Sequence, residues 1–506
     1  MFHFMRIAVF LVLGCAAGTA VAQVQLGNEV LAAGGFQELQ GKRVGLITNP
    51  SGVSRAGKST VEMLRHAPEV RLVALFGPEH GVYGDVKAGE NIADRVDRRT
   101  GLPVHSLYGA TRKPTPAMLK GLDALVYDLQ DTGVRSYTFI STMGLAMEAC
   151  AEAGVAFVVL DRPNPLGGER VEGPMVEDRF RSFVGQWNIP YAYGMTCGEL
   201  ARMINGEGWI RKPCSLTVIP MSGWRRSMVW RDTGLPWVPT SPNVPRADSP
   251  LYYAATGLFG ELAGGSGANI GTRLRRPFEC VIAPWLDARR FSAAMSGYGL
   301  RGVGFPTFTV LHEGERLQGV SLKISDPARA PLVAINFHLL DAIREASGRD
   351  LFAEALKRNK DFQMFDKVCG SDEIRRELKA GKSASEIVNS WRAGEQAFRQ
   401  KRAKYLLYTE GVLTEVAGGF KPPPTVELKS APVVETRPVA PVATAVPEPR
   451  PPRIITLSKG DSVVKIAENF GVNPSDIALA NPGLNLNRLK VGQKIKIPWT
   501  EETTAK

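Results

Sequence analysis

The sequence predicts an α/β protein that consists of a large body on a parallel sheet, a proline-rich linker and a small terminal module. Three observations predict this organisation. Apolar strand-like runs alternate with helical stretches after residue 41, which is typical of a parallel sheet with helices on both faces. Ten of the 35 prolines fall within residues 421–452. A strand–helix–helix–strand pattern follows this segment, over residues 453–498.

The composition is that of a globular protein. Of the 506 residues, 44% are hydrophobic and 22% are charged, which excludes a wholly disordered chain and a protein with many membrane spans. The formal net charge of +12 favours an anionic partner, such as a nucleic acid or a bacterial cell wall. The length allows roughly two to four domains.

Residues 1–22 are predicted to be a signal peptide. A short basic start precedes an apolar run over residues 7–14 and small residues that end at Ala22, the pattern of a cleaved leader. The run is too short to anchor the chain in a bilayer. Cleavage after Ala22 is favoured, and the alternative is a lipid anchor at Cys15, although Leu13 is unusual for a lipoprotein box. Either route predicts an exported protein, periplasmic or associated with the cell envelope.

Five cysteines remain after cleavage, and they are far apart in the sequence. They are Cys150, Cys197, Cys214, Cys280 and Cys369. Their spacing matches neither a C-x-x-C metal pattern nor a dense disulfide framework. We therefore expect most of them to be small core residues, with at most one or two bridges. No metal and no cofactor is expected.

The sequence pattern predicts four strands and three helices in the first part of the body. The expected strands cover residues 43–48, 70–76, 124–129 and 156–160, and the expected helices cover residues 58–66, 116–122 and 140–153. In an open parallel sheet, the ligand crevice lies beyond the carboxyl ends of the strands. The residues that follow these strands are therefore the first place to look for a site.

Polar side chains follow all four predicted strands. They are Asn49 after the first, Glu79 and His80 after the second, Asp128, Asp131, Arg135 and Tyr137 after the third, and Asp161, Arg162 and Asn164 after the fourth. Carboxylates, amides, arginines and a histidine at consecutive strand ends favour a polar site over ordinary connections. Farther along, Thr196 and Glu199 have the spacing of a capping box, for which a structural role is expected.

Several common active-site motifs do not occur in this sequence. A G-x-G-x-x-G motif does not follow the first strand, and neither a phosphate-binding G-x-x-x-x-G-K-[ST] loop, an H-E-x-x-H zinc motif nor a G-x-S-x-G elbow is found. The carboxylate, amide and aromatic side chains that the sequence does contain are those that cleavage of a glycosidic bond requires. That reaction needs a protonated carboxylic acid at the leaving oxygen, and usually a second carboxylate or the substrate's own acetamide.

Seven motifs occur in order over residues 36–416, among them GLITNPSGV, LFGPEHGVYGD, LVYDLQDTGVRSYTFISTM, DRPNPLGG and PTSPNVP. This set resembles the NamZ-type exo-β-N-acetylmuramidase family. The resemblance implies a Rossmann-like N-terminal subdomain, a smaller α/β C-terminal subdomain, and a site in the cleft between them. It also implies release of β-1,4-linked N-acetylmuramic acid from the non-reducing ends of peptidoglycan, with Glu79 as the catalytic glutamate.

The residues around Glu79 are consistent with that role. A carboxyl group on a glycine-flanked strand end is partly withdrawn from water, which favours the protonated form that a general acid needs. The alternative is that Glu79 caps a helix or pairs with an arginine. His80 is expected to tune the acid or bind sugar, and Asp128 and Asp131 are candidates for the second carboxylate. The other strand-end residues would bind substrate.

An arginine in the site is chemically apt, because the lactyl group of muramic acid carries a carboxylate that a guanidinium can bind bidentately. Which arginine does so is open. The stretch after Phe259 departs from the family pattern in its spacing, although Glu261 keeps an acidic residue there. Glu261 is therefore a further candidate for substrate binding or for the second carboxylate.

The terminal module contains GDS, IA, FGV, NP, VGQ and IP in order. It resembles a LysM domain over its whole length, which implies a βααβ fold that binds N-acetylglucosamine-containing glycans, chiefly peptidoglycan. The implied glycan-binding residues are Gly460, Asp461, Ser462, Asn481 and Pro482. Asp461 and Ser462 would also cap a helix.

The predicted organisation is thus a signal peptide, a two-part catalytic body, a linker and a glycan-binding module. The boundaries expected are 1–22, 36–247, 248–416, 417–452 and 453–498. The function expected is a glycoside hydrolase that acts on peptidoglycan, with neither nucleic acid nor an integral membrane span involved. Two alternatives stay open: a non-catalytic peptidoglycan-binding protein, and a cell-wall amidase or esterase.

Overall fold

The structure is a computed structural model that describes most of the body and parts of the terminal module. The described residues are 23–84, 86, 89–90, 93–357, 362–408, 453–457, 466, 469–470, 477, 481 and 491–497. The chain forms two compact units, Met1–Pro423 and Pro424–Lys506. The predicted signal peptide (1–22) and the predicted linker (417–452) both lie outside the described residues. None of the described helices is long and apolar enough to cross a bilayer.

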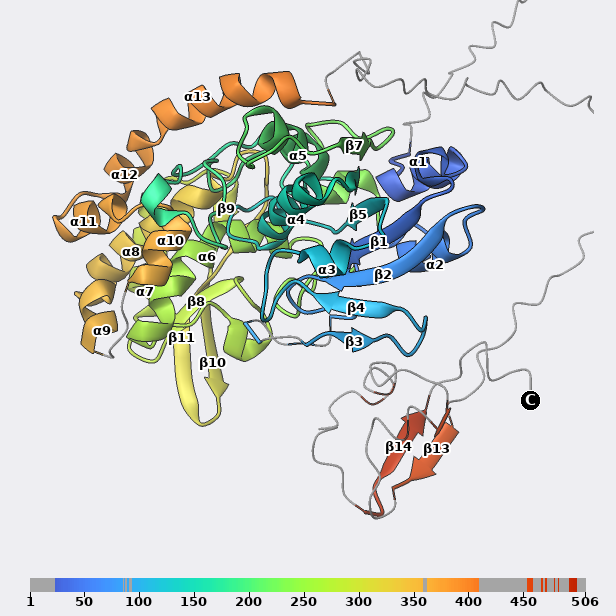
Figure 1. Cartoon of the computed structure of the whole chain (residues 1–506). Coiled ribbons are helices and arrows are strands. Elements are labelled where there is room, and N and C mark those ends of the chain that lie inside the picture. The colour runs from blue at the N-terminus through green and yellow to red at the C-terminus, as the bar shows by residue number, and fades with distance from the viewer. Residues whose placement is uncertain are drawn as a thin grey trace, which may run out of the picture. The chain divides into compact units, whose positions relative to one another are not determined.

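A seven-stranded sheet organises the first part of the body (Figure 1). Its strands are β1 (Arg43–Thr48), β2 (Arg71–Gly77), β3 (Arg95–Val96), β4 (Pro103–Ser106), β5 (Ala124–Asp128), β6 (Ala156–Leu160) and β7 (Leu216–Ile219). Their order is β3-β4-β2-β1-β5-β6-β7, and all pairs except β3–β4 are parallel. After β1 the chain forms β2, β3 and β4 on one side of that strand, and it then forms β5, β6 and β7 on the other side. This is a Rossmann-like sheet with a switch point between β1 and β5.

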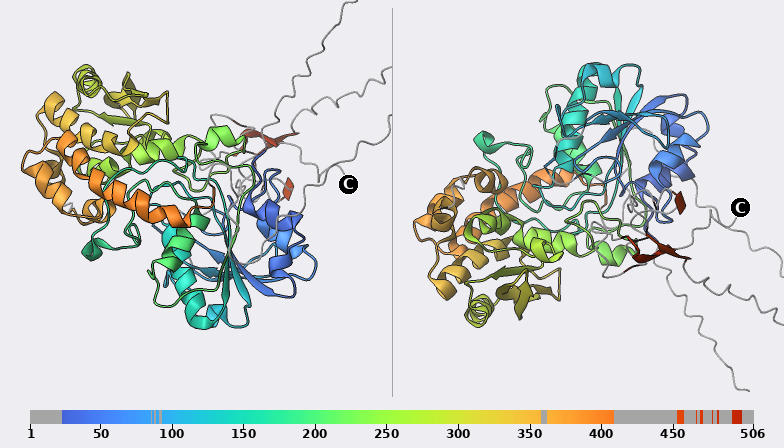
Figure 2. Two further views of the ribbon diagram at one scale, coloured as in Figure 1. Left: turned by 90° about the horizontal axis from the view of Figure 1, so that it is seen from above. Right: turned by 90° about the horizontal axis from the view of Figure 1, so that it is seen from below.

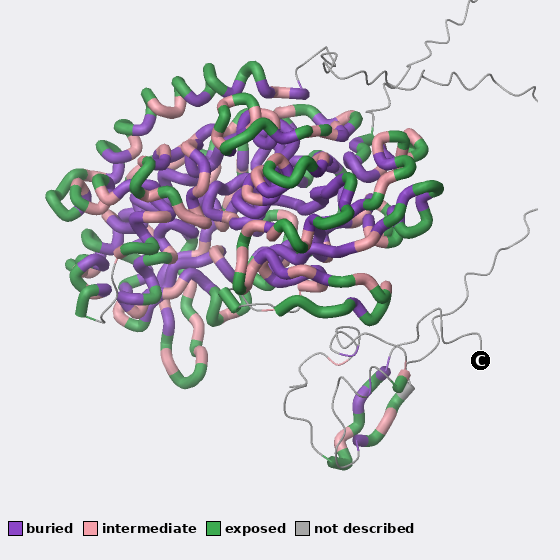
Figure 3. The backbone as a smooth tube through the Cα atoms, viewed as in Figure 1, coloured by how far each residue is buried: buried purple, intermediate pink, exposed green. Residues whose placement is uncertain are grey.

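Helices cover both faces of this sheet. They are α1 (Gly27–Ala33), α2 (Thr60–Arg65), α3 (Pro116–Leu119), α4 (Phe139–Ala153) and α5 (Cys197–Gly206). Leu125 and Tyr127 of β5 belong to the core cluster shared with α3, α4 and α5, whereas Val126 belongs to the cluster shared with α1 and α2. This period-two alternation follows from strand geometry. Because both faces are covered, the central strands β1, β2, β5 and β6 are mostly buried, whereas the edge strand β3 is exposed (Figure 3).

The predicted strands agree closely with the observed ones. β1 and β6 have the predicted bounds, β5 ends one residue earlier than predicted, and β2 begins and ends one residue later than predicted. β3, β4 and β7 were not predicted from the sequence. Each is only two to four residues long, and such a short run has too little apolar pattern to be recognised. In chain order the four polar strand ends are therefore not consecutive, since β3 and β4 come between β2 and β5, but in the sheet the four strands are neighbours in the order β2-β1-β5-β6.

The second part of the body is mainly helical, with two small sheets. Its helices are α6 (Ser249–Ser266), α7 (Ala288–Gly297), α8 (Leu332–Ser347), α9 (Leu351–Lys357), α10 (Gln363–Cys369), α11 (Glu373–Lys379), α12 (Ala384–Ser390) and α13 (Arg392–Arg402). Its strands are β8 (Cys280–Ala283), β9 (Val303–Gly304), β10 (Thr307–His312), β11 (Glu315–Ser321) and β12 (Lys323–Ile324). The sheets have the orders β10-β11-β8 and β12-β9. Figure 2 shows this mainly helical part beside the sheet. The α/β class predicted for the second subdomain is confirmed.

The end of the body returns to the first part. α13 lies along the side that carries α5 (Figure 1), and Arg402 donates hydrogen bonds to the carbonyls of Gly168 and Gly194. Leu407 and Tyr408 pack into a cluster with Val24 and Leu26 at the start of the described chain. The two parts are therefore held together by residues that are far apart in the sequence.

The terminal module contains an antiparallel pair, β13 (Arg453–Thr456) and β14 (Lys494–Ile497). Its small core includes Leu457, Ile466, Ile477, Ile495 and Ile497. Ile466 and Ile477 are both helical, so the described residues agree with two helices between two strands. This is the βααβ order expected of a LysM domain.

Candidate active site

Glu79 lies just beyond β2, and its carboxylate is held from three sides. Thr138 Oγ1 donates to Glu79 Oε2 at 2.7 Å, and the backbone N–H of Gly89 donates to Oε1 at 3.1 Å. The Tyr108 hydroxyl forms a third hydrogen bond, and burial together with the Glu79 charge raises the pKa of Tyr108. The Glu79 side chain is only half-buried. It is thus an oriented carboxyl group that a ligand can reach.

His80 holds the loop that follows Glu79. It is 5% exposed, and its backbone has a φ of 72°, in the left-handed region. Its Nδ1 lies 2.9 Å from the carbonyl oxygen of Val86. Since a carbonyl only accepts, Nδ1 carries a proton in this contact. This arrangement supports the loop and leaves the sugar-binding role of His80 a prediction.

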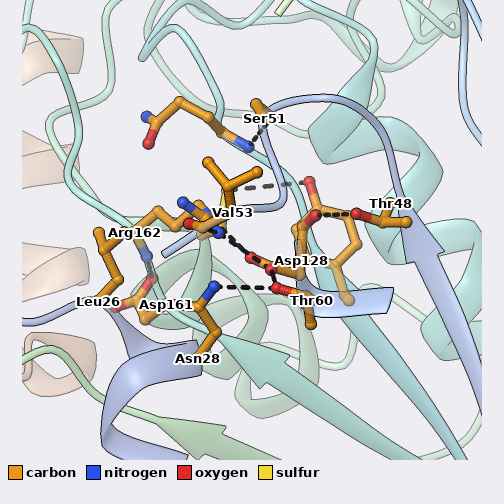
Figure 4. A network of polar contacts seen from close by, with 12 residues as sticks. Leu26, Asn28, Thr48, Ser51, Val53, Thr60, Asp128, Asp161 and Arg162 are labelled. Atoms are coloured by element: carbon orange, nitrogen blue, oxygen red, sulfur yellow. Dashed lines mark hydrogen bonds and ion pairs between the residues drawn. The ribbon is translucent and has the colours of Figure 1, made fainter. Parts of the chain in front are cut away.

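Asp128 forms a buried ion pair with Arg162 (Figure 4). Arg162 donates from Nε to Oδ1 at 2.5 Å and from Nη2 to Oδ2 at 3.0 Å, and Thr60 donates to Oδ2 at 2.5 Å. Arg162 also donates to the carbonyl of Val53 at 2.9 Å. Asp128 is 0% exposed and Arg162 is 4% exposed. The pair joins β5 to the loop after β6, which supports a structural role for both residues, while their catalytic and binding roles stay predictions.

Arg135 is fully enclosed by backbone carbonyls. Its Nη1 donates to Pro174 and Ile189, and its Nη2 donates to Val368 and Cys369, at 2.5 to 3.0 Å. The side chain is 0% exposed, and burial lowers its pKa to about 10. Its guanidinium thus connects the two parts of the body through these carbonyls, and substrate binding by Arg135 stays a prediction.

Asp161 occupies a comparable structural position at the end of β6. Its Oδ1 accepts from the N–H groups of Gly198 and Arg162, and its Oδ2 accepts from the hydroxyls of Thr196 and Tyr408. It is 0% exposed, and burial raises its pKa to about 6. Asp161 therefore organises the start of α5, and its substrate-binding role stays a prediction. The capping box predicted for Thr196 and Glu199 is confirmed at the same helix start.

The two asparagines also support loops. Asn164 donates to the carbonyl of Met195 at 2.9 Å and accepts from the N–H of Leu166 at 2.9 Å. Asn49 donates to the carbonyl of Thr240 at 3.3 Å and is 4% exposed. Both amides are used within the protein. Their predicted role in substrate binding stays a prediction.

Asp131 differs from the other buried aspartates, because one of its oxygens is unpaired. Oδ2 accepts from the N–H of Gly133 at 2.6 Å and from the Tyr193 hydroxyl at 2.5 Å. Oδ1 is buried and has no partner within the described part of the chain. Burial raises the pKa of Asp131 to about 6, although Tyr193 and two backbone N–H groups favour the charged form. It can therefore carry a proton near neutral pH.

Aromatic and hydroxyl side chains connect the sheet ends to α6. Tyr137 donates to Thr240 Oγ1 at 2.7 Å, and its ring meets that of Tyr253 edge-on at 6.1 Å. The Tyr253 hydroxyl lies 2.8 Å from Ser136 Oγ. Burial raises the pKa of Tyr253 first, and the charges of Glu261, Glu79 and Asp131 raise it further. Tyr253 is thus near all three carboxylates. Glu261 is exposed on α6.

Tyr108, Thr138 and Tyr253 were not predicted from the sequence. Tyr108 follows the short strand β4, so the strand-end rule would have selected it if that strand had been recognised. Thr138 directly precedes α4, which is an ordinary position for a threonine. Tyr253 lies near the start of the apolar helix α6, and nothing in the local pattern distinguishes it from a core residue.

The five cysteines that the structure describes are all buried and free, which confirms their predicted core role. Among the described residues, no three His, Cys, Asp or Glu side chains are grouped so that they could hold a metal ion. In the terminal module, Asn481 donates to the carbonyls of Ile477 and Lys496 and accepts from the Lys496 N–H. Its amide ties a turn to β14. The other four predicted glycan-binding residues, Gly460, Asp461, Ser462 and Pro482, lie outside the described residues.

The fold and the site define a Rossmann-like α/β protein with an oriented glutamate near the switch point of its sheet and a terminal LysM module. The family model described as "Exo-beta-N-acetylmuramidase NamZ, N-terminal" matches residues 44–248, and its C-terminal counterpart matches residues 251–408. The model of the LysM domain matches residues 455–498. The chain belongs to the NamZ exo-β-N-acetylmuramidase family.

Individual relatives agree with this assignment. The peptidoglycan beta-N-acetylmuramidase NamZ of Bacillus subtilis (strain 168) is 42% identical over 394 residues, which are 76% of this chain and 92% of that protein. A crystal structure of a DUF1343 family protein from Bacteroides fragilis is 46% identical, with a TM-score of 0.71, and the match covers 76% of this chain and 99% of that one. A second such protein from the same organism is 29% identical, with a TM-score of 0.59, over 77% and 99% of the two chains.

Proposed function

We propose that this protein is an exo-acting glycoside hydrolase that releases β-1,4-linked N-acetylmuramic acid from the non-reducing ends of peptidoglycan fragments. Membership of the NamZ family supports the reaction class, and the Bacillus subtilis relative is named for its action on peptidoglycan. The observation that carries the proposal is the Glu79 carboxyl group, half-exposed and held by Thr138 and Tyr108. Glu79 is the general acid that protonates the leaving glycosidic oxygen.

Two further carboxyl groups are candidates to assist Glu79. Asp131 has a buried, unpaired oxygen, and Glu261 is exposed on α6 close enough to affect Tyr253. Asp128 is unsuitable, because both of its oxygens are occupied by Arg162 and Thr60. The substrate acetamide is the alternative partner in such reactions. Asp131 is our preferred side chain, since an unpaired buried oxygen has a free lone pair for a sugar hydroxyl.

The terminal module places the enzyme at its substrate. A LysM domain supports peptidoglycan binding, and the protein acts at the cell wall or outside the cell. Residues 1–22 serve as the export signal, with lipid attachment at Cys15 as the alternative to cleavage. Val24 and Leu26 belong to the buried core, so both processing routes keep the residues that the fold needs. In a Gram-negative envelope, this location is the periplasm.

The experiment that tests the proposal is mass analysis of the products formed from defined peptidoglycan fragments. One fragment carries muramic acid at the non-reducing end, and its matched control carries N-acetylglucosamine there. We expect free N-acetylmuramic acid from the first fragment and no monosaccharide from the second. Binding of both fragments without any product would instead indicate a non-catalytic wall protein. Release of free stem peptide would indicate an amidase.

A further inference from the structure

Arg112 lies in the loop after β4 and is held by two aromatic rings. Its guanidinium carbon is 5.1 Å from the ring centre of Tyr108 and 4.4 Å from that of Phe183. The two rings are 5.9 Å apart. Arg112 is exposed, and it forms no ion pair with any carboxylate of the described residues. Its positive charge is therefore positioned by aromatic faces and not neutralised by an acid.

Tyr108 connects this guanidinium to the candidate acid. The tyrosine hydroxyl bonds to the Glu79 carboxylate, while the Arg112 charge acts on the same hydroxyl with the opposite sign. The ring contact and an ordinary hydrogen-bond length put Arg112 at most about 11 Å from the Glu79 carboxylate. A muramic acid residue has its glycosidic bond at C1 and its lactyl carboxylate on the oxygen of C3. The acid and the anion-binding group must therefore be separated by about one sugar.

The two arginines that follow the predicted strands, Arg135 and Arg162, are not available for this purpose. Arg135 is surrounded by four carbonyl groups, and Arg162 is paired with Asp128. Both side chains are nearly or wholly inaccessible to solvent. Stacking on aromatic faces, in contrast, leaves the N–H edge of a guanidinium free for a carboxylate. Arg112 therefore combines access, charge and a free edge.

We propose that Arg112 binds the lactyl carboxylate of the terminal muramic acid, and that it thereby selects muramic acid over glucosamine ends. This inference rests on the proposed function. The contact is bidentate, from two guanidinium N–H groups to the two carboxylate oxygens. Tyr108 and Phe183 fix the plane of the guanidinium, while Tyr108 also holds Glu79. One aromatic side chain thus sets the position of both polar groups relative to the sugar.

The test compares two disaccharides that end in N-acetylmuramic acid: one with a free lactyl carboxylate, and one with the corresponding carboxamide. Hydrolysis is measured for the full-length protein and for Arg112→Gln, Arg112→Lys and Arg99→Gln. Arg99 is a matched control, because it is exposed and stacks on Tyr83 at 4.6 Å. Affinity for both disaccharides is measured by calorimetry in a Glu79→Gln background, with and without Arg112→Gln.

We expect the acid to be preferred over the amide by about 10- to 100-fold in affinity and in kcat/KM, as for hydrogen bonds to charged groups. Arg112→Gln should abolish this preference by raising KM for the acid alone, Arg112→Lys should keep part of it, and Arg99→Gln should leave it unchanged. The inference is overturned if the Arg112→Gln variant still prefers the acid over the amide, or if the wild-type protein shows no such preference. If the wild-type protein hydrolyses neither disaccharide, the proposed function fails, while the binding data still test Arg112.

Discussion

Thr138 Oγ1 donates a 2.7 Å hydrogen bond to Glu79 Oε2, across 59 positions of the sequence. Glu79 follows β2 and Thr138 directly precedes α4, so two separate elements of the sheet's switch region meet at one carboxyl group. This contact orients an acid that is still half-exposed. It is the geometric basis for assigning the chemistry to Glu79 and not to the more deeply buried Asp128.

The first prediction concerns Glu79 itself. Glu79→Gln should lower kcat for release of N-acetylmuramic acid by about 10²- to 10⁴-fold, because an amide cannot transfer a proton to the leaving oxygen. Product release is measured by mass spectrometry, and folding by thermal unfolding. Glu62→Gln on the exposed face of α2 is the matched control and should keep full activity. Normal turnover by Glu79→Gln would remove Glu79 from the mechanism.

The second prediction concerns the orienting hydroxyl. Thr138→Val keeps the shape of the side chain but removes the donor to Glu79. A hydrogen bond to a charged group contributes about 1.5–3 kcal/mol, so kcat should fall by about 10- to 100-fold, with KM changed less. Thr138→Ser retains the hydroxyl and should restore most of the rate. Equal rates for the valine and serine variants would show that the contact has no role in the reaction.

The third prediction separates structure from catalysis at Asp128. Arg162→Met leaves a buried carboxylate without its ion-pair partner, and this should lower the free energy of unfolding by about 3–5 kcal/mol. Asp128→Leu combined with Arg162→Met removes both charges and should recover part of that loss. Urea unfolding measures these changes. If Arg162→Met unfolds like the wild type, the ion pair does not hold the end of β5.

The fourth prediction concerns the pH dependence of stability. Burial raises the pKa of Asp161 from 3.8 to about 6, so the folded protein binds more protons than the unfolded chain between these values. The ionisation of Asp161 therefore contributes a fall in the free energy of unfolding as the pH rises from about 4 to 6. Asp161→Asn cannot ionise and should flatten this fall, by up to about 1.4 kcal/mol per pH unit.

Asp131 supplies a second contribution of the same sign, because its pKa is also raised to about 6. The Asp131→Asn and Asp161→Asn double variant should therefore be flatter than either single variant. Asp287→Asn is the control: hydrogen bonds from the Arg290 and Arg289 N–H groups lower the pKa of this helix-capping residue. This control should leave the fall between pH 4 and 6 in place. An unchanged slope in the double variant would contradict the prediction.

The fifth prediction concerns the terminal module. A chain that ends at Pro423 retains the first compact unit and lacks the second. It should hydrolyse a soluble disaccharide at the wild-type rate, because Glu79 and its partners all belong to the first unit. Retention on insoluble peptidoglycan, measured by co-sedimentation, should be lost. Full retention of the shortened chain would place the wall-binding surface on the body.

The sequence predicted the strands well where each strand is a long apolar run between polar ends. β1 and β6 have the predicted bounds for this reason. It failed for β3, β4 and β7, which are too short to establish a period. Because β4 was missed, Tyr108 was missed with it, although Tyr108 contacts Glu79. Because the short strand β4 was not predicted, a residue of the candidate site was also not predicted.

The charged residues at the strand ends did not by themselves distinguish site residues from structural ones. Local sequence identified Glu79, Asp128 and Arg162 equally as polar residues after strands. Their burial differs, because Asp128 and Arg162 satisfy each other across the sheet, whereas Glu79 is half-buried and bonded to neutral hydroxyls. Whether a charge meets its partner inside the protein depends on which strand ends become neighbours. The order β2-β1-β5-β6 decides this.

By itself, the sequence determined the parallel-sheet body, the proline-rich segment, the LysM module and the family, because these depend on runs and motifs that are local in the chain. The tertiary structure decided which polar residues can meet a ligand. It enclosed Arg135 in backbone carbonyls, paired Arg162 with Asp128 and left Arg112 exposed on two aromatic rings. The physical reason is desolvation: a buried charge must be paired within the protein, so only long-range packing determines which charge stays available.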